Sequence, residues 1–140
     1  MNKFSKTSLE RLKTCDSRIQ KVFYRVIEIM DCSILCGVRN KGDQNKMFDE
    51  GHSRCEWPDS KHNVIRPNEF SWAIDAAPYY IEVPHIRWDK GSLYRWYFFG
   101  GIVMALARDM GIYLRWGGDW DGDTYVKDQH FNDLPHFELL

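Results

Sequence analysis

The first third of the chain carries apolar residues at helical spacing. Between Asp16 and Met30 these residues recur every three or four positions and fall on one side of a helix: Ile19, Val22, Phe23, Val26 and Ile27. Asp16 and Ser17 are suitable N-cap residues directly before this run. Leu9 and Leu12 indicate a shorter helix before it. The pattern therefore predicts two N-terminal helices, of which the second has an apolar side that faces a core.

Short apolar runs between polar stretches predict strands and loops in the middle of the chain. The predicted segments are, in order, a buried strand over 34–38, a polar helix around 43–50 that stops at Gly51, a loop over 51–70, a strand over 72–76 and an extended segment over 79–83. Pro78 and Pro84 end the last two segments, because proline lacks the N–H that a strand ladder needs.

A long helix is predicted from Ser92, a suitable cap, to Gly111, a residue type common just after a helix. This helix contains an apolar run from Trp96 to Ala107. The run is far shorter than the ~20 residues that span a bilayer. We therefore expect a buried helix and no membrane insertion.

Alternating apolar and polar residues predict two half-buried strands over 112–116 and 136–139. The resulting order of elements is ααβαββαββ, which lacks the regular alternation of strands and helices found with parallel sheets. We therefore expect an α+β fold in which helices pack on a small antiparallel sheet. Because no repeat or linker divides the sequence, residues 1–140 are predicted to form a single domain.

The composition narrows the classes of function. The chain has 140 residues, of which 44% are hydrophobic, and this is enough for a core without disulfides or metal. Its 19 basic and 20 acidic residues give a net charge of -1, which argues against a nucleic-acid binder. The 4 cysteines form no CxxC pair, and the first residues do not resemble a signal peptide. We expect free thiols in a reducing cytoplasm.

Two histidines lie near carboxylates in a pattern that favours metal chemistry. His62 lies in the predicted loop, and Asp75 is the only charged residue of the next strand, where a buried carboxylate needs a partner. His136 begins the last strand, and Asp133 stands three positions before it. His62, Asp75 and His136 supply three protein ligands and leave a fourth position open, which is typical of catalytic zinc.

Asp133 and Arg39 complete the predicted chemistry. Zinc lowers the pKa of a water molecule to about 7, and a carboxylate within reach, here Asp133, can take the proton as general base. Arg39 follows the strand predicted over 34–38 and is the candidate cation for the developing oxyanion. A ligand set of two histidines and one aspartate also suits cobalt or manganese.

Several short motifs, taken in chain order, resemble one enzyme family. They are Gly37-x-Arg39 with Gln44, Ser60-x-His62, Ala73-x-Asp75, Trp116-Gly117-Gly118-Asp119-Trp120 and Asp133-x-x-His136. The pattern resembles the L-alanyl-D-glutamate peptidases of bacteriophage endolysins, which are related to the D-alanyl-D-alanine metallopeptidases and share a fold with the hedgehog signalling domain. The resemblance extends from about Leu9 to the C-terminus.

The resemblance implies a role for each matching residue. The implied roles are zinc ligand for His62, Asp75 and His136, catalytic base for Asp133, and substrate contact with polarisation of the scissile carbonyl for Arg39. Two features depart from the family pattern. The gap between His62 and Asp75 is longer than usual, and Pro135 replaces the residue that commonly precedes the last histidine.

Other interpretations remain open at several positions. Gln44 and Ser60 are assigned to substrate binding. The alternative for Gln44 is a solvated helix residue, and the alternative for Ser60 is a residue that orients the loop carrying His62. Arg39 has an ordinary surface ion pair as its alternative. His52 and Cys55 form a rival metal pair, although no second close pair completes a structural cluster.

A further acidic run, residues 119–123, resembles a calcium loop. The twelfth position of that loop, counted from Asp119, is His130 instead of the required glutamate. We therefore predict a solvated turn there.

Together these expectations describe a zinc metallopeptidase that hydrolyses the peptide stem of bacterial peptidoglycan, between L-alanine and D-glutamate, as a phage endolysin. We expect a monomer that stays in the host cytoplasm until lysis and depends on a separate holin to reach the cell wall. The alternatives are a D-alanyl-D-alanine carboxypeptidase of the same fold and a non-enzymatic, zinc-stabilised binding module.

Overall fold

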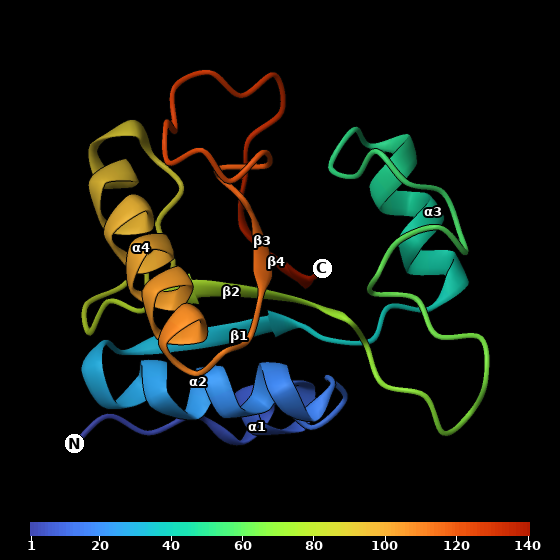
Figure 1. Ribbon diagram of the computed structural model, residues 1–140, viewed down its shortest axis with the longest axis horizontal. Helices are drawn as coiled ribbons and strands as arrows, with labels where there is room; N and C mark the ends of the chain where they lie inside the picture. The colour runs from blue at the N-terminus through green and yellow to red at the C-terminus, as the bar shows by residue number, and fades with distance from the viewer.

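The computed structural model describes residues 1–140 and contains four α-helices, one short 3-10 helix and four strands (Figure 1). In chain order these are α1 (Lys6–Leu12), α2 (Ser17–Ile29), β1 (Cys32–Cys36), α3 (Lys41–Asp49), β2 (Ala73–Pro78), η1 (Lys90–Ser92), α4 (Leu93–Asp109), β3 (Leu114–Gly117) and β4 (Asp133–Leu139). The predicted α+β class is confirmed.

The four strands form one antiparallel sheet in the order β1-β2-β4-β3. The last strand therefore lies between β2 and β3 and joins distant parts of the chain. In the β2–β4 pair, Ile74 is the partner of Phe137, and Asp75 is the partner of His136. Because side chains alternate along a strand, these two pairs point to opposite faces of the sheet.

One face of the sheet carries the hydrophobic core. Ile74 and Phe137 belong to a cluster of 20 buried residues that includes the apolar side of α2 and Phe99 and Val103 of α4. The rings of Phe23 and Phe99 contact the Phe137 ring edge-on, with centroids 5.9 and 6.0 Å away. The helical spacing in the sequence thus corresponds to a side of α2 that packs on the sheet.

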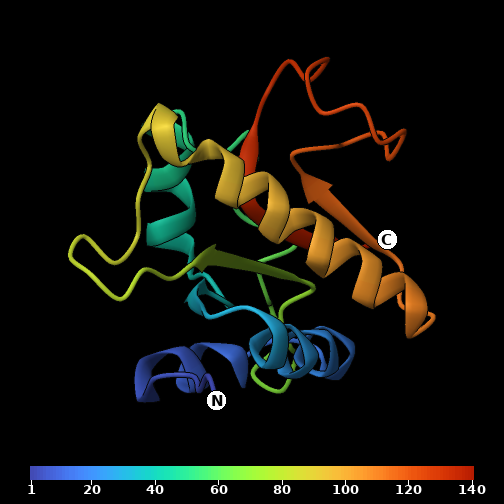
Figure 2. The same ribbon diagram turned by 90° about the vertical axis from the view of Figure 1, so that its left-hand side faces the viewer.

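The edge strand β1 is covered by α1, which lies beside it (Figure 2). Ser8 accepts a hydrogen bond from the backbone N–H of Ile34 at 2.9 Å, and Arg11 donates one to the carbonyl of Ile34 at 3.0 Å. These side chains satisfy backbone groups that an exposed edge would leave unpaired. At the start of α2, Asp16 accepts the N–H of Arg18, as expected of an N-cap.

Two local predictions are wrong. Residues 79–83 form no strand, because β1 begins at Cys32 opposite Pro78 and leaves the following residues without a neighbouring strand. This segment instead turns back on itself, with the N–H of Tyr80 bonded to the carbonyl of His85. Ser92 stands at the start of α4 but makes no cap hydrogen bond, since its hydroxyl donates to Asp89.

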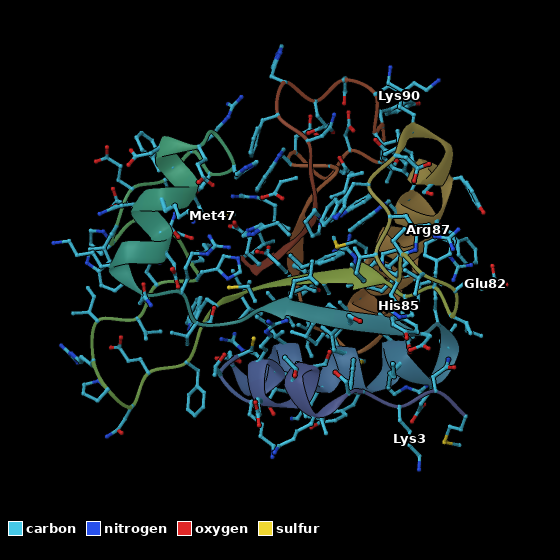
Figure 3. The ribbon with its side chains drawn as sticks, turned by 180° about the vertical axis from the view of Figure 1, so that it is seen from behind. Lys3, Met47, Glu82, His85, Arg87 and Lys90 are labelled. Atoms are coloured by element: carbon cyan, nitrogen blue, oxygen red, sulfur yellow. The ribbon has the colours of Figure 1, made fainter.

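The opposite face of the sheet is not covered by α2 or α4. Helix α3 stands apart from the other helices (Figure 1), and side chains occupy the space between α3, which carries the labelled Met47, and the sheet (Figure 3). None of the helices has both the length and the apolar character needed to cross a membrane.

Candidate metal centre

Two neighbouring strands and one loop bring His62, Asp75 and His136 together on the face opposite the core. Asp75 of β2 and His136 of β4 are direct cross-strand partners, so the sheet register itself places them side by side. His62 comes from the loop between α3 and β2 and is fully buried, with 0% of its surface exposed.

The three side chains converge through one atom each. His62 Nε2 lies 3.2 Å from Asp75 Oδ1 and 3.2 Å from His136 Nδ1, and the last two atoms are 3.3 Å apart. Tetrahedral zinc with bonds of about 2.0 Å separates neighbouring ligand atoms by roughly 3.3 Å. Two imidazole nitrogens and one carboxylate oxygen at this spacing therefore fit three positions around a zinc ion.

Hydrogen bonds fix the orientation of His62. Its Nδ1 lies 2.7 Å from the carbonyl oxygen of Gly37, so Nδ1 carries the proton and Nε2 keeps its lone pair for a metal. Gly37 itself packs against the residues that follow α1, where an added Cβ would lie 2.1 Å from Thr14 Oγ1, so glycine is required at this position. Ser60 accepts the backbone N–H of His62 at 3.2 Å, which places Ser60 behind the histidine as a residue that orients its loop.

His136 is oriented by a residue that the sequence interpretation missed. The Nε2 atom of His136 lies 2.8 Å from Glu138 Oε1, which leaves Nδ1 to face His62 and Asp75. Glu138 stands two positions after His136 on the same strand, so both side chains lie on one face of the sheet. The alternation of side chains along this strand could have indicated from the sequence that His136 and Glu138 lie side by side.

Arg39 and Gln44 form a buried network behind Asp75. Arg39 donates to Asp75 Oδ2 at 2.8 Å and to Gln44 Oε1 at 3.1 Å. Gln44 is completely buried and donates to Ser53 Oγ at 3.0 Å and to the Cys55 carbonyl at 2.6 Å. The alternatives of a solvated helix residue for Gln44 and a surface ion pair for Arg39 are therefore wrong. Both residues lie in the immediate surroundings of the ligand group.

Asp133 begins β4 and lies beside Gly117 of β3. A Cβ at Gly117 would come within 2.1 Å of the Asp133 carbonyl oxygen, so only glycine permits the two strands to approach here. Burial, reinforced by the negative charge of Asp75, raises the pKa of Asp133 to about 6. A carboxyl group with this pKa can both accept and donate a proton near neutral pH.

The ligand residues are strongly coupled in the absence of metal. Burial alone would lower the pKa of His62, but the adjacent Asp75 carboxylate outweighs it and raises the pKa to about 10. Burial would also raise the pKa of Asp75, yet His62 and His136 hold it well below its usual range. These shifts favour a protonated His62 beside an ionised Asp75, and a metal cation bound here would compete with that proton.

A cysteine lies at the border of the centre. Cys36 is the register neighbour of Asp75 on β1, and its sulfur lies within 4.8 Å of ligand atoms of His62 and Asp75. The shorter spacing of 3.2 to 3.3 Å favours the set that contains His136. The rival metal pair, His52 and Cys55, belongs to neither group of three ligand-type residues that lie within 4.8 Å of one another.

The acidic run after β3 forms the second such group, with Asp119, Asp121 and Asp123. Their carboxylates accept backbone N–H groups within the loop, including the N–H of Thr124 to Asp119 at 3.0 Å. Asp121 and Asp123 are exposed. These bonds agree with the predicted turn.

Comparisons with known proteins give one consistent result. A family model described as phage L-alanyl-D-glutamate peptidase matches residues 1–140. The L-alanyl-D-glutamate peptidase of Escherichia phage T5 is 27% identical over 143 residues, covering 99% of this chain and 98% of the phage protein. The crystal structure of the Serratia marcescens L-Ala D-Glu endopeptidase ChiX has the same fold, with a TM-score of 0.70 and 21% identity over 99% of this chain and 91% of that one.

Proposed function

The chain belongs to the phage L-alanyl-D-glutamate peptidase family, and from this membership we propose that it is a zinc-dependent endopeptidase that cleaves peptidoglycan stem peptides between L-alanine and D-glutamate. The observation that carries the proposal is the convergence of His62 Nε2, Asp75 Oδ1 and His136 Nδ1 at 3.2 to 3.3 Å. These three residues would hold the zinc. When bound, zinc supplies Lewis acidity toward water and toward the scissile carbonyl.

Asp133 is the general base of the proposed reaction. It takes a proton from the attacking water and later transfers it to the amine of D-glutamate, which leaves as the carbonyl of L-alanine becomes a carboxylate. The raised pKa of Asp133, about 6, supports both roles, since the group is ionised at neutral pH and still basic enough to take a proton. The charges of Asp75, His136 and His62 all act on the Asp133 carboxyl, which supports a position near the ligand group.

Arg39 has two roles in the proposal. Its bond to Asp75 Oδ2 holds that oxygen and leaves Oδ1 turned toward the histidines. The guanidinium has five N–H donors, and those not used by Asp75 and Gln44 remain for the developing oxyanion of the substrate. Gln44 and Ser60 support the site indirectly, through Arg39 and through the His62 loop.

The biological role that fits this chemistry is lysis of the host by a phage. We propose that the protein acts as a monomeric endolysin, waits in the host cytoplasm, and reaches the cell wall once a separate holin has opened the membrane. Its macromolecular substrate is then the peptide stem of peptidoglycan.

Fragment analysis tests the proposed reaction. Purified peptidoglycan is incubated with the protein, with chelator, and with chelator followed by added zinc, and the products are identified by mass spectrometry. We expect peptides with a new N-terminal D-glutamate, loss of these products with chelator, and recovery with zinc. Release of terminal D-alanine alone would indicate a carboxypeptidase, and a zinc-loaded protein that releases nothing would indicate a binding module.

A further inference from the structure

Glu138 lies beside the candidate metal centre and contacts three side chains that come from different parts of the chain. Its Oε1 atom lies 2.8 Å from His136 Nε2. Its Oε2 atom lies 3.1 Å from Lys61 Nζ and 3.8 Å from Arg115 Nη1. Each carboxylate oxygen therefore has its own set of partners, the imidazole on one side and two cations on the other.

Because Glu138 is buried, its carboxylate depends on these partners. Only 9% of the surface of Glu138 is exposed, and a buried carboxylate is unfavourable unless it is paired and hydrogen-bonded. Lys61 and Arg115 balance its charge through Oε2, so Oε1 can remain directed at His136. The cations thus pair with the carboxylate without competing for the oxygen that the histidine uses.

The sheet and the loop both fix Glu138 in place. Arg115 of β3 and Ala73 of β2 are its cross-strand neighbours. Lys61 comes from the loop and directly precedes His62. Lys61 also donates to the backbone carbonyl of Leu139, next to Glu138. Glu138 therefore connects the strand of one histidine ligand with the loop of the other.

We propose that Glu138 is a positioning residue for the metal, which holds His136 with Nε2 protonated and Nδ1 free to bind the ion, while Lys61 and Arg115 hold Glu138. The inference rests on the proposed zinc peptidase function. A carboxylate that accepts the second N–H of a histidine ligand fixes the tautomer and the ring orientation and makes the ligand nitrogen more basic. Glu138 itself touches neither the ion nor the substrate.

Metal affinity gives the first test. Zinc dissociation constants are measured by competition with a chromophoric chelator for the wild-type protein, Glu138→Gln and the matched control Glu28→Gln. Glu28 is exposed and pairs only with Arg25 at 2.7 Å, so its replacement removes a charge of the same kind elsewhere. We expect Glu138→Gln to bind zinc roughly 10- to 100-fold more weakly and Glu28→Gln to bind it like the wild type. Equal affinity in all three proteins would overturn the inference.

A second measurement needs no variant and keeps the inference testable if Glu138→Gln does not fold. Nitrogen-15 NMR of the zinc-loaded wild-type protein reports which ring nitrogen of His136 carries a proton. We expect a protonated Nε2 and a metal-bound Nδ1. A proton on Nδ1 with Nε2 on the metal would overturn the role of Glu138 while leaving zinc binding intact. A wild-type protein that binds no zinc would instead overturn the proposed function, and the inference with it.

Discussion

The two faces of the sheet differ in what holds them together, although the same strands build both. On one face, Ile74 and Phe137 pair across β2 and β4 and pack against helices. On the other face, the next pair along, Asp75 and His136, contributes to a buried polar cluster. Because side chains alternate along each strand, a shift of one residue in the β2–β4 register would exchange the two environments.

The comparison teaches that the core face and the polar face respond to different kinds of change. Apolar packing is not directional, and it tolerates substitutions that keep volume. The polar cluster depends on particular partners, since a buried charge that loses its partner is left uncompensated. Changes on the first face should therefore reduce stability and leave the chemistry, whereas changes on the second face should impair metal binding and catalysis.

The largest expected effect is on the polar face, at Asp133. Asp133→Asn keeps the size of the side chain but removes the group that accepts the proton. We expect turnover on purified peptidoglycan to fall by about 10² to 10⁴, which is about 3 to 5 kcal/mol in the barrier, with zinc content and melting temperature close to wild type. Product release followed by mass spectrometry, with metal analysis of the same sample, measures both quantities. Wild-type turnover in a zinc-loaded Asp133→Asn protein would remove Asp133 from the mechanism.

A paired experiment at neighbouring positions of β4 probes the two faces directly. Phe137→Ala removes a fully buried ring and should lower the free energy of unfolding by about 3 to 5 kcal/mol. Its gain in stability on adding zinc should stay like that of the wild type, about 2.7 kcal/mol at a zinc concentration of 100 times Kd. Urea unfolding with and without zinc measures both values.

His136→Ala is the counterpart of Phe137→Ala on the other face. It should abolish the zinc-dependent gain in stability, because it removes one of three ligands. Full zinc occupancy in His136→Ala would contradict the proposed ligand set. A zinc response that disappears in Phe137→Ala would show that the two faces are not independent.

Sequence patterns predicted the core face well, for a physical reason. The spacing of apolar residues between Asp16 and Met30 directly reports which side of α2 is buried, and Asp16 has its capping role from local geometry alone. The candidate ligands His62, Asp75 and His136 were predicted from residue types and from the order of the motifs, and both can be read from the sequence without knowledge of the fold.

The rest of the site depends on contacts that no local pattern encodes. Gln44 lies on a helix of mostly polar sequence, and its burial arises only where α3 meets the loop that carries Ser53 and Cys55. Glu138 gains its partners Lys61 and Arg115 from the loop and from β3. Such residues become visible only when the register and the loop path are known.

The pH dependence of stability distinguishes the polar face from the core. In the metal-free protein the pKa of His62 is raised to about 10 from an ordinary value of 6.5. Above pH 6.5 the unfolded chain releases this proton while the folded protein keeps it, so the stability gained from protonated His62 is full below pH 6.5 and is lost as pH rises toward 10. We expect the melting temperature of the metal-free protein to fall between pH 6.5 and 9.0. The upper limit of this range is the ordinary pKa of a cysteine thiol, 9.0.

Zinc and a matched variant sharpen this measurement. Zinc replaces the proton, so its stabilising effect should grow over the same pH range as competition from protons weakens. His62→Gln cannot hold the proton and should flatten the fall in melting temperature. A metal-free wild-type protein whose melting temperature is constant or rises from pH 6.5 to 9.0 would contradict the coupling between His62 and Asp75.

The smallest expected effect lies on the helix-covered side, at the start of α2. Asp16 accepts the backbone N–H of Arg18 at 2.9 Å and also pairs with its guanidinium at the surface. Asp16→Ala removes both contacts and should lower the free energy of unfolding by about 1 kcal/mol, whereas Asp16→Asn keeps an N-cap acceptor and should cost less, since an exposed ion pair contributes little. Urea unfolding measures the difference, and zinc affinity should be unchanged in both proteins. If Asp16→Ala weakened zinc binding, the helix-covered face would contribute to the geometry of the metal centre, and the division between the two faces would not hold.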